Sequence, residues 1–309
     1  MTMIEAMEAR VSTRSFDGKG LDALEAAQLA TMLESVATLT APFGNRVRLA
    51  LAGGAVAAGA ASTGSAAMGG AASKPAKLGT YGLRAGASAF IVPAVLPGVG
   101  AMEDAGFILE KAVLEATVMG WSSCWIGGVF SRSKAAEIVA AADGELVPAV
   151  IALGRPAGKR SLADRIVTGT AKSRSRKPLE NLVFSHDGSG LKEGSLSEPW
   201  LTVVQALRGA PSASNKQPWR LARLPEGGGW LIFLDEDRMY NNSLGEVHIQ
   251  NIDIGIGMLH FQEAAAVLGM AGKWEPLPGV GDGLAEEKDV AQALGMGEGR
   301  GWKPIALWR

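Results

Sequence analysis

The chain has 309 residues, and 47% of them are hydrophobic, so it can bury one large core or two cores of ordinary size. Its formal net charge is −1 and its pI is near 6.4, values that give no long-range attraction for nucleic acid or for an anionic membrane. We therefore expect a globular protein with neither as a partner, although a local pair such as Arg10 and Arg14 could still bind one phosphate.

The hydrophobic pattern predicts helices and strands along the whole chain. In the first half it predicts helices over 4–9, 21–36, 102–119 and 135–142, strands over 46–51, 87–96 and 148–153, and a loop or short strand over 122–128. In the second half it predicts a helix over 201–207, a strand over 230–234 and a helix over 252–268. The glycine-rich stretches 279–283 and 295–301 lack the strand-then-helix context of a dinucleotide site and indicate loops.

Residues 49–73 carry no charge and are long enough in principle to cross a bilayer. They are mostly Ala, Gly, Ser and Thr and lack flanking aromatic anchors, so their transfer into a bilayer is unfavourable. We reject a membrane span here and expect a strand that runs into a flexible or loosely helical connection.

Cysteine and histidine are scarce. Cys124 is the only cysteine, which excludes an intrachain disulfide and suits a reducing compartment, and three histidines cannot complete the usual zinc sets. The first residues include acids and lack the basic-then-apolar order of a signal peptide. We expect a cytoplasmic protein without a metal site. Cys124 receives no role, since a lone cysteine is usually a small buried hydrophobe, and His260 is expected to be a core or interface histidine.

The two halves of the chain repeat one pattern. Four residues of the first half recur in the second at one constant spacing: Asp104, Gly106, Gly120 and Trp125 correspond to Asp253, Gly255, Gly269 and Trp274. The run A-L-G-R at 152–155 likewise corresponds to A-L-W-R at 306–309. We therefore expect an internal duplication, with copy one over residues 1–184, a Gly- and Ser-rich linker over 185–196 and a shorter copy two over 197–309.

Residues 210–219 read A-P-S-A-S-N-K-Q-P-W, a dense group of hydrogen-bonding side chains between two apolar runs. Such a loop suits close approach to a planar polar ligand, because its side chains are small and its prolines fix its shape in advance. The same residues are also ordinary turn and helix-cap chemistry, so on composition alone both interpretations stay open.

This loop, continued by Arg220 and Leu221, closely resembles the flavin-lining loop of the nitroreductase family of FMN-dependent oxidoreductases. The segment R-V-S-T-R-S-F at 10–16 resembles the short basic segment near the start of the same family. The resemblance implies an α+β nitroreductase-like fold with antiparallel-rich central sheets flanked by helices. Since such folds are two-fold dimers with flavin sites between subunits, two fused copies would form a pseudo-two-fold dimer within one chain, resembling the fused, pseudo-dimeric members of the family.

The resemblance also implies a set of FMN-binding residues. Two arginines with a hydroxyl between them suit the phosphate of FMN, and a glycine lets the backbone approach the ring, with Gly127 as the candidate for the contact to flavin N5. Arg174 and Arg176 resemble a second basic pair that reaches the phosphate, although a solvated basic stretch is an equally good interpretation. The candidates are Arg10, Val11, Ser12, Arg14, Ile126, Gly127, Gly128, Arg174, Arg176, Pro211, Ser212, Ala213, Ser214 and Asn215.

The two copies keep complementary parts of this site. Copy one has the basic segment but shows Pro42, Phe43, Gly44 and Asn45 where the loop serines would be. Copy two has the loop, but the residues before it contain no R-x-S-x-R. We therefore expect one complete site and one degenerate site, one FMN per chain, and a monomer that acts as an internal pseudo-dimer.

In this family NADH or NADPH passes hydride to the flavin, and an electron-poor acceptor such as a nitroaromatic or a quinone is then reduced in the same place. No side chain need act as acid or base, because the flavin carries the chemistry. Two alternatives stay open: an FMN-binding storage or sensor protein without turnover, and a flavin-consuming or dehalogenating relative of the same fold.

Overall fold

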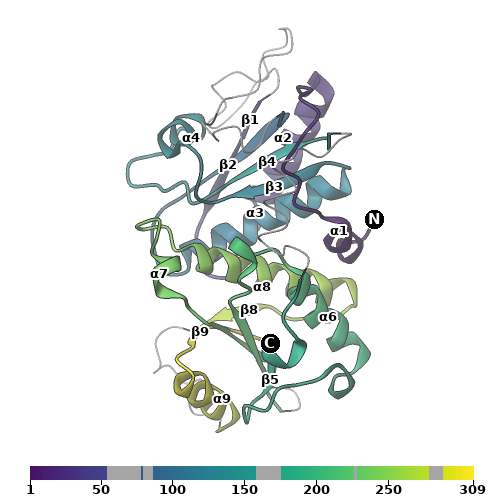
Figure 1. Ribbon diagram of the computed structural model, residues 1–309, viewed down its shortest axis with the longest axis vertical. Coiled ribbons are helices and arrows are strands. Elements are labelled where there is room, and N and C mark those ends of the chain that lie inside the picture. The colour runs from purple at the N-terminus through teal and green to yellow at the C-terminus, as the bar shows by residue number, and fades with distance from the viewer. Residues whose placement is uncertain (54–77, 79–85, 158–174, 226–227, 278–287) are drawn as a thin grey trace.

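The computed structural model describes residues 1–53, 78, 86–157, 175–225, 228–277 and 288–309 (Figure 1). Arg174, the stretch 279–283 and most of the uncharged stretch 49–73 lie outside these residues. Within them, no helix is both long enough and apolar enough to cross a membrane.

Two mainly antiparallel sheets form the ends of the molecule in Figure 1. The first sheet has the order β1-β2-β4-β3, with β1 at Val47–Ala52, β2 at Ala89–Val95, β3 at Ser122–Ile126 and β4 at Val150–Gly154. The second has the order β5-β6-β7-β9-β8, with β5 at Val183–Ser185, β6 at Trp219–Arg223, β7 at Trp230–Leu234, β8 at Trp274–Pro276 and β9 at Lys303–Trp308. The central strands β2 and β7 are buried along their whole length because helices or loops cover both faces.

Two long helices, α3 at Ala101–Val118 and α8 at Ile249–Val267, pack against each other between the sheets (Figure 1). Both are apolar on most sides, as expected for helices surrounded by protein. Gly120 and Gly269 follow these helices with φ of 86° and 71°, which confirms the predicted helix ends. The other helices are α1 at Met3–Ala9, α2 at Ala23–Ala37, α4 at Arg132–Ile138, α6 at Glu198–Gly209, α7 at Arg238–Asn241 and α9 at Lys288–Gly299.

The contact between α3 and α8 is reciprocal. A Cβ added at Gly106 would lie 2.1 Å from the carbonyl oxygen of Ile252, and one added at Gly255 would lie 1.8 Å from the carbonyl oxygen of Glu103. At the spacing that relates the two halves, Gly106 corresponds to Gly255 and Glu103 corresponds to Ile252. The two contacts are therefore equivalent, with the roles of the helices exchanged. Close approach of the two backbones requires glycine at both places.

The strands β1-β2-β4-β3 and β6-β7-β9-β8 also share an order and antiparallel neighbours throughout. In both series one helix precedes the first strand, a long helix joins the second strand to the third, and a further helix joins the third to the fourth. Strand β5 has no counterpart in the first sheet and pairs in parallel with β6.

The stretch 295–301 is largely helical, so its interpretation as a loop was wrong. Helix α9 continues to Gly299 and packs on the outer face of the second sheet. A Cβ at Gly297 would lie 2.5 Å from the Phe233 ring. Glycine here serves close packing of helix on sheet, a tertiary effect that overrides its low helix propensity.

Residues next to the predicted linker are packed against the second sheet. Leu182 and Val183 are buried in the main core, and the Leu191 N–H donates to the Val183 carbonyl at 2.8 Å. Leu196 is also buried. The last residues assigned to copy one thus already contribute a strand to the second sheet, while the boundaries themselves stay a prediction.

Candidate functional site

The basic segment 10–14 lies along strand β3. It leaves helix α1 at Arg10, and Ser12 bridges in parallel to Ser123. The Thr13 N–H donates to the Ser123 carbonyl at 2.8 Å, and the Ser12 hydroxyl lies 3.5 Å from the Cys124 sulfur. Cys124 is buried, as expected. The segment is therefore fixed beside the strand that ends at Ile126 and leads into Gly127 and Gly128.

Arginine nitrogens of this segment are buried without hydrogen bonds. They are Nε and Nη1 of Arg14 and Nε of Arg10. A buried donor left unsatisfied is costly, by about 1–3 kcal/mol. Sites where such donors gather are suited to an anionic ligand that accepts from them.

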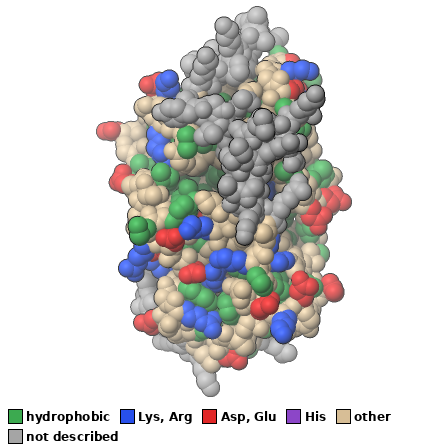
Figure 2. All heavy atoms as spheres, viewed as in Figure 1, with side chains coloured by type: hydrophobic (Ala, Val, Ile, Leu, Met, Phe, Trp, Pro, Cys, Tyr) green, Lys and Arg blue, Asp and Glu red, His purple; other side chains and the backbone are tan. Residues whose placement is uncertain are grey.

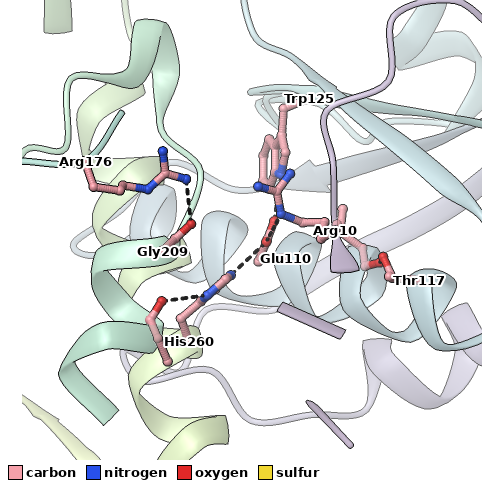
Figure 3. A network of polar contacts seen from close by, with 9 residues as sticks. Arg10, Glu110, Thr117, Trp125, Arg176, Gly209 and His260 are labelled. Carbon is pink, nitrogen blue, oxygen red and sulfur yellow. Dashed lines mark hydrogen bonds and ion pairs between the residues drawn. The ribbon is translucent and has the colours of Figure 1, made fainter. Parts of the chain in front are cut away.

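Arg10 stands beside a buried carboxylate, Glu110, which is not among the site residues predicted from the sequence (Figure 3). Its Nε lies 3.7 Å from Oε1 of Glu110, whose side chain is fully buried. The Trp125 indole N–H donates to Oε2 of Glu110 at 2.7 Å, and His260 Nε2 is 2.9 Å from Oε1. The expectation of a buried interface histidine is confirmed for His260. Glu110 is one of four acids in α3, and nothing in the local sequence distinguishes it from the other three.

The loop 211–217 is held in a strained conformation. Ser214, Asn215 and Gln217 have φ of 50°, 54° and 49°, although none is glycine. The Ala213 N–H donates to Asp253 at 2.9 Å, and the Ser214 hydroxyl lies 2.8 Å from that of Tyr240. Strained positions of this kind often cluster at ligand-binding loops.

Asn215 and Ser212 are positioned by this loop and by the chain around Arg176. The Arg176 guanidinium donates to the Gly209 carbonyl at 2.8 Å (Figure 3) and to Oδ1 of Asn215 at 3.4 Å. The Asn215 amide donates to the Ser175 carbonyl at 2.9 Å. The Ser212 hydroxyl accepts from the Gln217 N–H at 2.9 Å. Arg176 and the loop therefore form one unit.

Electrostatics link this unit to the basic segment. Burial lowers the pKa of Arg176 from its ordinary value, and the positive charges of Arg10 and then Arg208 lower it further. Arg10 of the first half thus acts on Arg176, which is bonded to the loop of the second half. Figure 2 shows basic and acidic side chains interspersed across the lower half of one face of the molecule.

Gly127 is fixed by contacts from two other elements. Its carbonyl accepts from Arg132 at 2.8 Å, and a Cβ at this position would lie 2.8 Å from Cδ1 of Ile249 at the start of α8. Burial lowers the pKa of Arg132. Gly128 has open space around it. Neither Arg132 nor Ile249 was expected from the sequence. Arg132 is only five residues away but belongs to no motif, and Ile249 is brought here by the tertiary structure.

Three candidates, Arg10, Ser12 and Arg14, thus lie on one segment beside β3. Four others, Ser212, Ala213, Ser214 and Asn215, lie on one loop, which Arg176 contacts from another part of the chain. Val11 is exposed, and Pro211 and Arg14 are half-buried. In the part of the chain that the structure describes, no group of three or more His, Cys, Asp or Glu side chains is arranged to hold a metal ion.

Comparison with solved structures identifies the class of fold. A "putative nitroreductase" from Thermotoga maritima MSB8 is 17% identical, the match covers 91% of each chain, and the TM-score is 0.55. A nitroreductase family protein from Clostridium novyi NT is also 17% identical over 51% of this chain and 87% of that chain, with a TM-score of 0.36. A nitroreductase with bound FMN from Bacteroides fragilis NCTC 9343 is 18% identical over 52% and 91%, with a TM-score of 0.37. The first of these shows that the chain has a nitroreductase-like α+β fold.

The family follows from a second comparison. The model of the family described as "Putative TM nitroreductase" matches residues 67–265, which is more than half of the chain. The chain belongs to this family. None of the curated proteins compared with it matches.

Proposed function

We propose that the protein is an FMN-dependent oxidoreductase that passes hydride from NADH or NADPH to an electron-poor acceptor such as a nitroaromatic or a quinone. The observation that carries the proposal is the set of buried arginine nitrogens without hydrogen bonds on Arg10 and Arg14. The charge of Arg10 acts on Arg176, which is bonded to the P-S-A-S-N loop. Family membership supports the reaction class.

The donor set fits a flavin phosphate. Arg10 and Arg14 offer charge-assisted donors, and a phosphate dianion has the acceptor oxygens that they lack. Ser12 lies between them in the sequence and contributes a hydroxyl. Binding there would supply hydrogen-bond acceptors to nitrogens that are otherwise buried without one, which favours the bound state.

The ring end of the flavin would lie against apolar side chains and backbone. Ile126 ends the strand beside the basic segment, and Gly127 and Gly128 follow it. Arg132 and Ile249 fix Gly127. A bound flavin supplies the hydride-transfer chemistry, so these residues need only orient the ring and exclude water. The loop 211–215 completes the proposed site from the second half of the chain.

We also propose that the chain consists of two copies of one unit that form a pseudo-two-fold dimer. Support comes from the shared strand order of β1-β2-β4-β3 and β6-β7-β9-β8 and from the reciprocal glycine contacts of α3 and α8. A contact in which the same positions meet from both sides is the mark of two-fold symmetry. On this basis we expect a monomer with one FMN.

The first test is the visible absorption spectrum of the purified protein, with the released flavin identified and counted per chain and the mass measured in solution. We expect about one FMN on a monomer-sized particle, followed by oxidation of NADH or NADPH when an acceptor is present. Tight FMN binding without nicotinamide oxidation would instead indicate a storage or sensor protein, and no flavin even after addition of FMN would contradict the proposal.

The phosphate assignment has its own test. Arg14→Ala should lower FMN affinity by about tenfold to a hundredfold, since it removes charge-assisted donors. Lys19→Ala, which removes an exposed cation near the same segment, is the matched control and should leave the affinity unchanged. Equal affinities of the wild type and Arg14→Ala in a fluorescence titration would show that the phosphate binds elsewhere.

A further inference from the structure

Glu110 poses an electrostatic problem for the phosphate site. Its carboxylate is fully buried and lies 3.7 Å from Arg10 Nε. A negative charge at that distance would offset the positive charge that Arg10 offers to an anionic ligand. The same carboxylate is nevertheless useful, because it orients Arg10 and accepts the Trp125 indole N–H at the end of β3.

His260 reaches this carboxylate from helix α8. Its Nδ1 lies 3.1 Å from the Ala206 carbonyl, an oxygen that can only accept, so Nδ1 carries a proton (Figure 3). Its Nε2 lies 2.9 Å from Oε1 of Glu110. A hydrogen bond between those two atoms requires one proton between them. Whether this proton lies on the nitrogen or on the oxygen, the histidine and the glutamate together have no net charge.

The comparison of the two halves supports a role specific to Arg10. At the spacing that relates Trp125 to Trp274, the position of Glu110 corresponds to Leu259. The Trp274 indole N–H donates instead to the Met258 carbonyl at 2.9 Å. The buried carboxylate thus occurs in the half that has the basic segment, and the half without that segment satisfies its tryptophan with the backbone.

The other charges near the pair do not replace His260. Lys111, the next residue of α3, is paired with Glu115 at 3.2 Å and with Glu263 at 3.1 Å. Arg176 is bonded to Gly209 and Asn215 and adds positive charge on the side of the loop. Within the described residues, His260 is the side chain that hydrogen-bonds Glu110 from the second half.

We propose that His260 is a positioning residue that shares one proton with Glu110, cancels the carboxylate charge and leaves the full positive charge of Arg10 for the phosphate of a bound flavin. The inference rests on the proposed FMN function. It assigns to the Glu110–His260 pair the role of orienting Arg10 and Trp125 without neutralising the phosphate site.

The test compares the affinities of FMN and riboflavin, which share the ring system but differ in the phosphate. The ratio of the two affinities reports the phosphate contribution, while a general loss of structure weakens both ligands alike. His260→Gln keeps an amide within reach of Glu110 but supplies no positive charge. We expect it to reduce the preference for FMN by roughly tenfold, because Glu110 then neutralises Arg10.

Two further variants complete the cycle. Glu110→Gln removes the charge, while its amide oxygen can still accept the Trp125 N–H and lie beside Arg10, so the preference for FMN should not rise above that of the wild type. The double variant Glu110→Gln/His260→Gln should restore the preference that His260→Gln loses. Thermal melts of each variant identify any that fail to fold.

The outcomes separate the inference from the proposed function. A wild type that prefers FMN, with an unchanged preference in His260→Gln, would overturn the role of His260 alone. If His260→Gln does not fold, Glu110→Gln decides, since a preference several times higher than that of the wild type would mean that Glu110 already neutralises Arg10. A wild type that binds neither flavin would overturn the proposed function, and the inference with it.

Discussion

The loop before β1 and the loop before β6 occupy the same place in the two series of elements, yet their polar groups are used differently. Both are anchored by an aspartate of the central helix pair: Asp104 accepts from the N–H groups of Phe43 and Asn45, and Asp253 accepts from that of Ala213. The Asn45 amide donates to Asp104 and to the Val99 carbonyl, both at 2.9 Å.

The first loop is closed by its own contacts. The Phe43 ring packs so tightly on Gly100 that a Cβ there would lie 2.0 Å from it. The second loop instead keeps positive φ at three residues that are not glycine, with Arg176 beside it. The first loop therefore serves stability, while the second retains strain in a form suited to binding.

The largest expected effect concerns the contact that joins the two halves. Gly255→Ala places a Cβ 1.8 Å from a backbone oxygen of α3, so the helices must separate. We expect a loss of stability at or above the roughly 1–3 kcal/mol typical of overpacking, measured by urea denaturation. Gly295→Ala in α9 has open space and is the control; it should stabilise slightly. Equal stabilities of the two variants would contradict the packing described for α3 and α8.

Asp104→Asn tests the closed loop. The substitution replaces one acceptor oxygen by an NH2 group that faces donors of Asn45, so at least one buried hydrogen bond is lost. We expect a cost of about 1–3 kcal/mol in the free energy of unfolding, with little change in flavin affinity. A loss of flavin affinity larger than the loss of stability would mean that the first loop also belongs to a binding site.

The two asparagines should respond in opposite ways. Asn45→Ala removes two hydrogen bonds and should cost about 1–2 kcal/mol of stability without weakening FMN. Asn215→Gly keeps the positive φ that the loop requires but removes the amide, so FMN affinity should fall roughly tenfold with a smaller loss of stability. Isothermal titration and thermal melts of both variants check the contrast, and parallel behaviour would remove the distinction between the loops.

The smallest effect is a pH dependence at Asp253. Burial raises the pKa of this carboxyl well above its ordinary value of 3.8, and only the Ala213 N–H opposes the shift. The folded state holds the proton of Asp253 more tightly than the unfolded state does. The contribution of this proton to the free energy of unfolding is therefore complete below the ordinary pKa and is lost as the pH rises through the raised pKa of the folded state. Asp253→Asn mimics the protonated form, so it should raise the melting temperature at pH 7 but hardly at pH 4. The same increase at both values would contradict this account.

Much of the fold could be predicted from local pattern. The strand Trp230–Leu234 was predicted to the residue, and both central helices were predicted within three residues at each end, because long apolar runs closed by Gly120 and Gly269 leave few alternatives. The helix through Gly297 could not be predicted, since its glycine reflects the Phe233 ring of another element. The roles assigned to Arg14 and Asn215 remain predictions for the experiments above.

By itself the sequence determined the apolar periodicity and the motifs that resemble one family. It also determined the residues that recur at a constant offset in the two halves, such as Asp104 and Asp253. Only the tertiary structure decided which charges meet. The contacts of Glu110 with Arg10 and His260 join residues about a hundred or more positions apart, and no local propensity encodes them. They depend on the close approach of α3 and α8, which the two glycines permit and which removes the carboxylate from water, so that its partners must come from the protein.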